Sequence, residues 1–268
     1  MTLAVPAGPA HTDYLLHLAD TALILGQRNA EWCGHGPIIE EDLALANISL
    51  DLIGQARLLY QHVAALRRDG ASSEDKLAFF RDVPEFRNYT LVELPHSTAF
   101  VPMAAPGRDY AVTIARNFLY SALMVLLWDA LASSNDSQLA AIAAKSLKES
   151  RYHLRHASDW LIKMGDGTEV SQARAQAALD HLMPYTQEFW SPSRAETLAI
   201  RSGAGIDTNG LRDAWNASVD QTLQQACLRR PSDQGHVPTG KQGVHSEHLG
   251  FVLAEMQGLA RAHPEAAW

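Results

Sequence analysis

The stretch LYSALMVLLWDALASSNDSQLAAIAAKSLKES, residues 119–150, predicts two long helices joined by a short turn. Its first part is apolar over most of a helical surface, and SSNDS at 133–137 is a cluster of turn-forming residues. The flanking sequence continues both patterns, which predicts helices over about 109–132 and 138–164. This part of the chain is therefore expected to form a helical hairpin.

A second predicted hairpin precedes the first. Thr12 caps a helix over about 13–32, and CGHGP at 33–37 ends it because two glycines and a proline stop a helix. The next helix covers about 38–66. Its centre, LALANISLDLIGQA at 43–56, is apolar on nearly every side, so we expect it to be buried all round.

The connection between the hairpins, about 70–107, is long, rich in proline and largely irregular, and no strand pattern of any length occurs. Two long helices, a long crossover and two more long helices are the connectivity of the ferritin-like fold. The sequence thus predicts an all-α, ferritin-like four-helix bundle with a long crossover between its second and third helices. We expect a single domain over 11–268 after a disordered tail at 1–10, with additional C-terminal helices within 168–190, 209–229 and 245–262.

The composition is that of an ordinary globular protein: 47% of the 268 residues are hydrophobic, 7% aromatic and 19% charged. The formal net charge of −8 argues against nucleic acid or an anionic membrane as the main partner, because both select clustered Lys and Arg. Cys33 and Cys227 lie outside any CxxC, so neither a disulfide framework nor a structural zinc site is expected. No signal peptide and no uninterrupted apolar stretch of membrane-spanning length is visible, which predicts a cytoplasmic protein.

Ferritin-like bundles can hold paired metal ions, and that site has a defined ligand set. A diiron centre needs a Glu from each of two helices and a Glu-x-x-His from each of the other two. Residues equally far from the two turns should lie at equal depth, and at the depth of such a centre this chain offers Asp20, Asp51 with Gly54 at i+3, Ser121, and Glu149 with Tyr152 at i+3. Both histidines and one carboxylate are missing, so the site is expected to be vacant.

The remaining polar groups at that depth need another explanation. A buried carboxylate is costly unless it is paired, so we expect Asp51 and Glu149 to be hydrogen-bonded within a buried polar network. The alternative is a metal-binding or ligand-binding bundle that uses Glu149, His153 and His156, which lie on one side of the predicted helix. His153 is at i+4 from Glu149 and so does not reproduce the i+3 geometry.

Three long segments of the chain resemble the PaaC-type subunits of bacterial phenylacetyl-CoA 1,2-epoxidases, and the resemblance covers nearly the whole chain. The segments are EWCGHGPIIEEDLALANISLDLIGQAR, KESRYHLRHASDWLIKMGDGTEVS and TGKQGVHSEHLGFVLAEMQ, and Trp268 at the end of the chain belongs to the same pattern. The resemblance implies a structural subunit of a multicomponent monooxygenase that epoxidises the aromatic ring of phenylacetyl-CoA in aerobic phenylacetate catabolism.

The resemblance also implies which components carry the chemistry. A catalytic ferritin-like subunit of the PaaA type holds the diiron centre and binds the CoA thioester. A reductase with flavin and an iron–sulfur cluster supplies electrons from NADPH. The PaaC-type subunit carries no cofactor or metal, has no independent activity, and pairs with the catalytic subunit.

Two parts of the sequence are candidates for the surface that contacts this partner. The junction of the first two helices carries Trp32, His35 and Pro37 beside an acidic EED, and we expect its face to dominate. The glycine-rich approach to the last helix, with Lys241, His245 and His248, is the second candidate. An isolated chain that exposes such a face is expected to form a homodimer through it.

Overall fold

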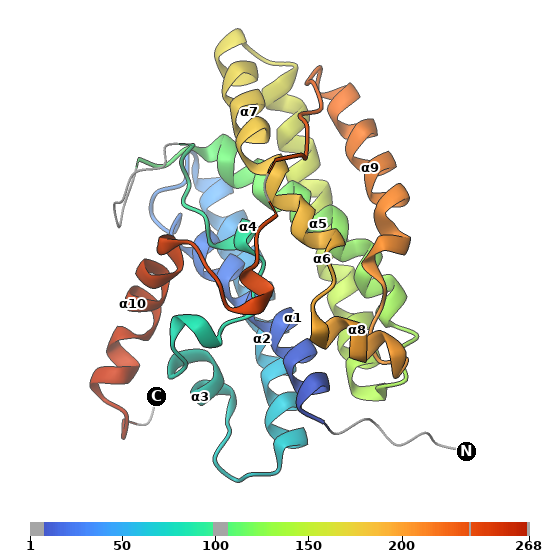
Figure 1. Cartoon of the computed structure of the whole chain (residues 1–268). Helices are drawn as coiled ribbons and strands as arrows, with labels where there is room; N and C mark the ends of the chain where they lie inside the picture. Colours follow the sequence, from blue (N-terminus) through green and yellow to red (C-terminus); the bar gives the residue numbers. More distant parts are fainter. Residues whose placement is uncertain (1–7, 99–106, 236, 267–268) are drawn as a thin grey trace. The chain divides into compact units, whose positions relative to one another are not determined.

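The computed structural model describes residues 8–98, 107–235 and 237–266 (Figure 1). Contacts between Cα atoms divide the chain into two compact units, one formed by the residues up to Leu94 together with those from Thr239, the other by Pro95–Pro238. The described residues contain no strand apart from a single bridge between Thr239 and Val244. The all-α class is therefore confirmed.

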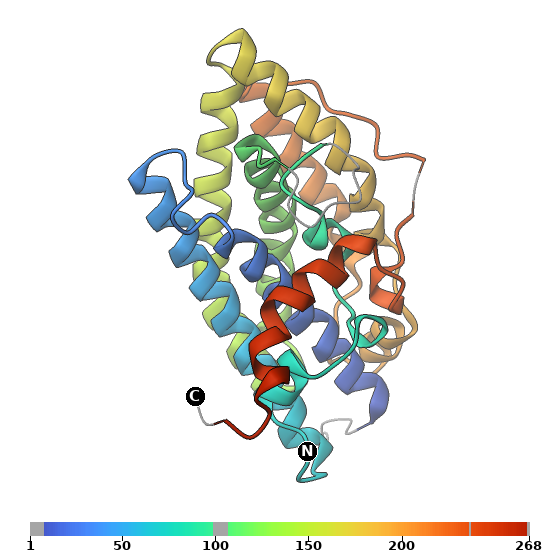
Figure 2. The same ribbon diagram turned by 90° about the vertical axis from the view of Figure 1, so that its left-hand side faces the viewer.

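The first unit is built on a hairpin of two long helices, to which the C-terminal helix returns. α10 packs against α1, α3 and α4 of this unit (Figure 2). Its elements are α1 (Pro9–Ala30), α2 (Ile39–Arg67), α3 (Glu74–Phe79), η1 (Val83–Glu85), α4 (Thr90–Glu93), η4 (Gly240–Gln242) and α10 (Glu247–Ala262).

The second unit is built on the other long hairpin, and shorter helices cover it. Asp136 begins α6 by accepting hydrogen bonds from the backbone N–H groups of Gln138 and Leu139 at 3.0 and 3.1 Å. Trp215 of α9 donates from Nε1 to the carbonyl oxygen of Leu119 in α5 at 3.2 Å. The elements are α5 (Tyr110–Leu131), α6 (Ser137–Gly165), α7 (Glu169–Leu182), η2 (Met183–Trp190), α8 (Arg194–Arg201), η3 (Thr208–Leu211) and α9 (Arg212–Gln225).

The four long helices end within a few residues of their predicted bounds. α1 begins at Pro9, so Pro9 and Ala10 are helical rather than part of a tail; residues 1–7 and Trp268 lie outside the described residues. The helix expected within 168–190 is α7 followed by the 3₁₀ turns of η2, where Pro184 interrupts the α-helical hydrogen bonding.

One expectation about apolar helices was wrong. α2 is not buried all round: Leu43, Leu50 and Ile53 expose 58%, 67% and 36% of their surface. By length and composition α5 is apolar enough to cross a membrane, although Arg116 and Asp129 interrupt its apolar sequence. However, 89% of its apolar window is buried in the folded chain, as in the core helix of a globular protein.

Candidate functional site

A buried polar cluster of the first unit surrounds the carboxylate of Asp20, which is fully buried in α1. Oδ1 accepts a hydrogen bond from the hydroxyl of Tyr60 at 2.6 Å and a second from Nη2 of Arg81. Oδ2 accepts from Nη1 of Arg81 at 3.0 Å and from the backbone N–H of Arg87 at 2.8 Å. Four donors therefore occupy the lone pairs of both oxygens, and none is left for a metal ion.

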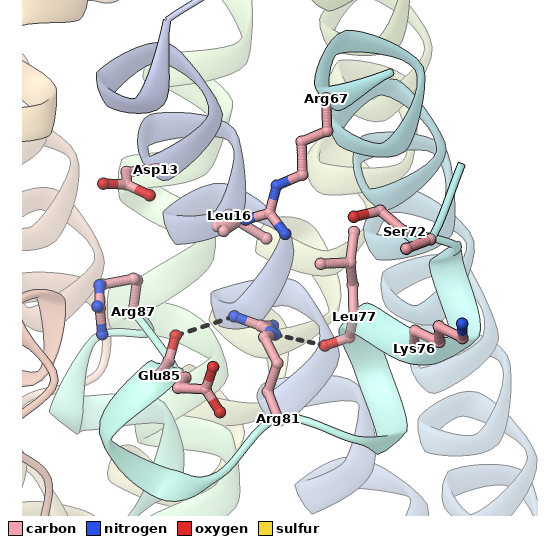
Figure 3. A pocket seen from close by; sticks show the side chains of 10 residues that line it. Asp13, Leu16, Arg67, Ser72, Lys76, Leu77, Arg81, Glu85 and Arg87 are labelled. Atoms are coloured by element: carbon pink, nitrogen blue, oxygen red, sulfur yellow. Dashed lines mark hydrogen bonds between the residues drawn. The ribbon is translucent and has the colours of Figure 1, made fainter. Parts of the chain in front are cut away.

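Arg81 is held in place from several directions (Figure 3). Its Nε donates to the carbonyl oxygen of Leu77 at 2.5 Å, its Nη1 to that of Glu85 at 3.0 Å, and the guanidinium lies 4.3 Å from the ring centroid of Phe86. Burial is the largest single influence on the pKa of Arg81 and lowers it, but the charge and hydrogen bond of Asp20, together with Tyr60 and Glu85, outweigh burial and raise this pKa. Arg81 therefore stays charged as the counter-ion of Asp20.

Tyr60 completes the cluster as a neutral donor. Burial, assisted by the neighbouring charge of Asp20, raises the pKa of its hydroxyl well above the ordinary value of 10.0. The proton therefore remains on the oxygen, where it serves the 2.6 Å bond to Asp20. A cavity of about 280 Å³ adjoins Arg81 and is lined by charged residues that include Asp13, Arg67 and Arg87 (Figure 3).

The register of α1 against α2 differs from the predicted one. Asp20 was expected to face Asp51, whereas it faces Tyr60, more than two turns further along α2. A Cβ added at Gly26 would lie 3.2 Å from Ile53 and 3.3 Å from the carbonyl oxygen of Ser49, which fixes the same register. The prediction counted residues equally from the glycines, but the connection is a turn over 31–35 followed by bends that lead into α2, so equal counts are not equal depths.

The hydrogen-bond partners of Asp20 include none of the other positions of the predicted vacant site. Asp51 and Gly54 are half-buried, Ser121 is buried, and Tyr152 is exposed. Glu149 was expected to be buried but is partly exposed, and its carboxylate lies 3.7 Å from the ammonium of Lys145. Asp51 and Glu149 are therefore less buried than expected, and the fully buried acid of the first unit described above is Asp20.

The alternative metal ligands on α6 do not converge either. His153 is buried, whereas Tyr152 beside it is exposed and stacks on His156 with ring centroids 6.3 Å apart. Among the residues the structure describes, Glu149, His153 and His156 do not form a group with ligand atoms within 4.8 Å of one another. The side chains present do not make a metal site of this set.

The glycine-rich segment before α10 contacts its own chain. His245 places Nδ1 2.7 Å from Oε2 of Glu93 and Nε2 3.0 Å from the carbonyl oxygen of Phe86. Each ring nitrogen of His245 therefore lies within hydrogen-bond distance of an oxygen of residues 83–94. Oε1 of Glu93 also accepts from the backbone N–H of Ser246 at 2.5 Å, and Oε2 from the side-chain amide of Asn88 at 2.8 Å.

These contacts occupy the second candidate surface for a partner. Lys241 is buried with its ammonium 5.3 Å from the ring centroid of Tyr89, and His248 is buried as well. Lys241 and His245 therefore hold the C-terminal segment on residues 83–94 of the same unit. Glu93 was not singled out from the sequence because it lies in the crossover, where no periodic pattern marks a buried acid.

The first candidate surface has a different anchor from the one predicted. Trp32 is only 5% exposed, whereas His35 and Pro37 are exposed at the start of α2. Beyond them an apolar stripe follows α2 at intervals of 4, 7 and 3 residues. Its members are Ile39, Leu43, Leu50 and Ile53, with exposures of 69%, 58%, 67% and 36%.

This stripe has the features of a helix-binding surface. Its spacing places all four side chains on one face over a length of ~21 Å, at 1.5 Å per residue. Near its end Ile53 also lines a groove of about 960 Å³ between α2, α3 and α10, together with Phe79, Phe80 and Leu259. The stripe therefore continues at Ile53 into a groove of the first unit whose lining is partly charged, with Arg57, Glu74 and Lys76 among its residues.

Comparisons with known proteins agree with this helical, subunit-like character. The family model described as phenylacetic acid catabolic protein matches residues 4–268. A relative from Escherichia coli (strain K12), named as the C-type subunit of 1,2-phenylacetyl-CoA epoxidase, is 44% identical over 257 residues, which cover 96% of this chain and 98% of the relative. The predicted resemblance is thereby confirmed: the chain belongs to the phenylacetic acid catabolic protein family, with the ferritin-like fold class expected of it.

Proposed function

We propose that the chain is a metal-free structural subunit of a multicomponent diiron monooxygenase that epoxidises the ring of phenylacetyl-CoA. The name of the Escherichia coli relative supplies the reaction and the membership of a multi-subunit enzyme, and the two chains match over nearly their full lengths. In this proposal a catalytic ferritin-like subunit carries the diiron centre, and a reductase supplies NADPH-derived electrons through flavin and an iron–sulfur cluster. All of these components work in the cytoplasm.

The observation that carries the proposal is the exposed apolar stripe of α2. Four large aliphatic side chains on one helix face are costly to leave in water, since their burial is worth about 1.5–3 kcal/mol each. An obligate partner that covers them recovers this free energy, and obligate interfaces are the more hydrophobic ones. We assign the stripe to the catalytic subunit, and to a second copy of the chain when that subunit is absent.

The buried polar cluster supports the metal-free part of the proposal. Asp20 is a carboxylate at a depth where a metal ligand is expected, but Arg81, Tyr60 and Arg87 already use its lone pairs. Arg81 supplies the positive charge that a metal ion would otherwise provide. The chain's own side chains thus satisfy this acid without iron.

Co-purification tests the assignment of the α2 stripe. We expect Leu43→Glu together with Leu50→Glu to abolish capture of the co-expressed catalytic subunit, because two carboxylates would be buried in an apolar interface. The matched control is Val170→Glu, which changes a side chain 70% exposed on α7 and should leave capture unchanged. Undiminished capture by the folded double variant would refute this interface.

Metal analysis tests the second half of the proposal. The purified chain should contain far less than one iron per chain, while the co-purified complex should contain about two per catalytic subunit. Two irons in the isolated chain would refute the metal-free role, whatever the outcome of the capture experiment.

A further inference from the structure

The exposed side of α6 carries a row of positive charges. At 100° per residue the row lies within roughly 120° of the helix circumference, and it extends for ~27 Å along the axis. Its members are Lys145, Lys148, Arg151, Arg155 and Lys163, all exposed to solvent. We call this row the basic face of α6.

The basic face contrasts with the charge of the whole chain, which is −8. Of the two acids of α6 between these cations, Asp159 is exposed and Glu149 is half-buried. Two of the five cations have carboxylate partners at long ion-pair distances: Lys145 is 3.7 Å from Glu149, and Arg151 is 3.6 Å from the exposed Asp129.

The remaining three cations, Lys148, Arg155 and Lys163, have no carboxylate within 4.0 Å in the described part of the chain. The two ion pairs lie at the surface, and such pairs contribute little to stability. Most of the positive charge of the basic face is therefore available to a partner.

Aromatic rings are interleaved with these cations. The guanidinium of Arg155 lies 5.6 Å from the ring centroid of Tyr152, and the ammonium of Lys163 lies 4.9 Å from that of Trp160. Tyr, Trp and Arg are enriched at the centres of protein interfaces. This composition favours a protein partner over a purely electrostatic ligand such as a lipid surface.

The basic face and the α2 stripe suit different kinds of association. The apolar stripe is costly in water and needs a permanent cover, whereas hydrated Lys and Arg side chains tolerate exposure between encounters. Opposite charges mainly raise the association rate and confer salt dependence, as transient partners require. The basic face thus matches a partner that binds, acts and leaves.

We propose that the basic face of α6 is the docking surface for a reversibly bound protein with an acidic surface. Resting on the proposed function, that partner is the electron-donating component of the complex. Epoxidation by O₂ places one oxygen atom in the ring and reduces the other to water, which consumes two electrons and two protons from a donor. Such a donor must dock repeatedly and does not belong to the permanent core.

Binding of the purified electron-donating protein to the chain in complex with its catalytic subunit tests the proposal. We expect Lys148→Glu with Arg155→Glu to weaken binding at least tenfold at 50 mM salt and to flatten its salt dependence, since two attractions become repulsions. Lys148→Gln with Arg155→Gln should fall between this variant and wild type. The control, Arg194→Glu with Arg201→Glu, makes the same charge change on α8 and should stay within twofold of wild type.

The same variants separate this proposal from the proposed function. Loss of donor binding with catalytic subunit still bound supports the docking surface. The proposal is overturned if the Glu variant binds the donor as tightly as wild type does. It is also overturned if the Glu variant loses binding to anionic vesicles or oligonucleotides while its binding to the donor is unchanged. If the catalytic subunit never co-purifies, the proposed function fails. The docking surface is then tested by binding of the donor to the isolated chain. The same charge reversals should weaken that binding, and unchanged binding would refute the docking surface.

Discussion

Replacing Asp20 by Asn isolates the charge of the buried cluster while keeping the shape of the side chain. The variant keeps one carbonyl oxygen as an acceptor. Its amide NH₂ replaces the other carboxylate oxygen, so the donors that bond to that oxygen in the wild type face another donor. The guanidinium of Arg81 remains, and with only 8% of its surface exposed it is poorly placed to replace its counter-ion by solvent. The substitution thus leaves a buried, uncompensated positive charge.

The expected cost follows from the four hydrogen bonds that Asp20 accepts. Breaking a buried ion pair by removing one partner typically costs 3–5 kcal/mol, and a hydrogen bond to a charged group is worth about 1.5–3 kcal/mol. These contributions overlap because the same Arg81 donors make both, so they should not be added. We expect the free energy of unfolding to fall by about 3–5 kcal/mol.

Urea denaturation of the isolated chain measures this difference. Asp220→Asn is the matched control: it removes one carboxylate from a pair with Arg230 at 2.7 Å, but Asp220 is 58% exposed, so the loss should stay below about 1 kcal/mol. Asp20→Asn combined with Arg81→Met should recover part of the stability, since neither charge is then stranded. Equal losses for Asp20→Asn and Asp220→Asn would refute the reasoning.

Two further predictions concern α6 and α10. Glu149→Ala should cost less than about 1 kcal/mol, because its carboxylate is partly exposed and its contact with Lys145 is 3.7 Å long; a loss above 3 kcal/mol in urea denaturation would mean that it is a buried, paired acid after all. Burial, with the charge of Arg28 nearby, lowers the pKa of His248 below its ordinary 6.5. As the pH falls, His248 therefore binds a proton in the unfolded chain before it does so in the folded chain, and the free energy of unfolding decreases below about pH 6.5. His248→Gln should therefore show a shallower loss of stability between pH 7 and pH 5 than wild type, and parallel curves would contradict this.

The long helices could be predicted because their information is local. Turn residues at 133–137 and the break at CGHGP bound segments whose apolar content is visible within one window. The exposure of Leu43 and Leu50 could not be predicted in the same way, because a docking helix and a core helix have the same composition. A sequence window shows that a residue is apolar, but it does not show whether the residue packs against its own chain or against another protein.

The buried cluster shows the opposite limit. Asp20 could be selected because an acid in an apolar helix is conspicuous, but its partners were missed. The pairing with Tyr60 depends on the register of α1 against α2, which the conformation of the connection at 31–38 sets. Arg81 comes from the crossover, where irregular backbone carries no periodicity that points a side chain inward. Local patterns do not encode such long-range pairings.

The origin of Arg81 has a consequence for assembly. Where a metal ion neutralises buried acids, folding of the bundle depends on the supply of that ion. Here the counter-charge of Asp20 is covalently part of the chain, and the crossover carries it to α1 through Arg81 and the backbone N–H of Arg87. Docking of the crossover therefore completes the hairpin of the first unit without a cofactor. A subunit of this kind can fold first and present its α2 stripe as a finished surface to a partner that still has to acquire its metal.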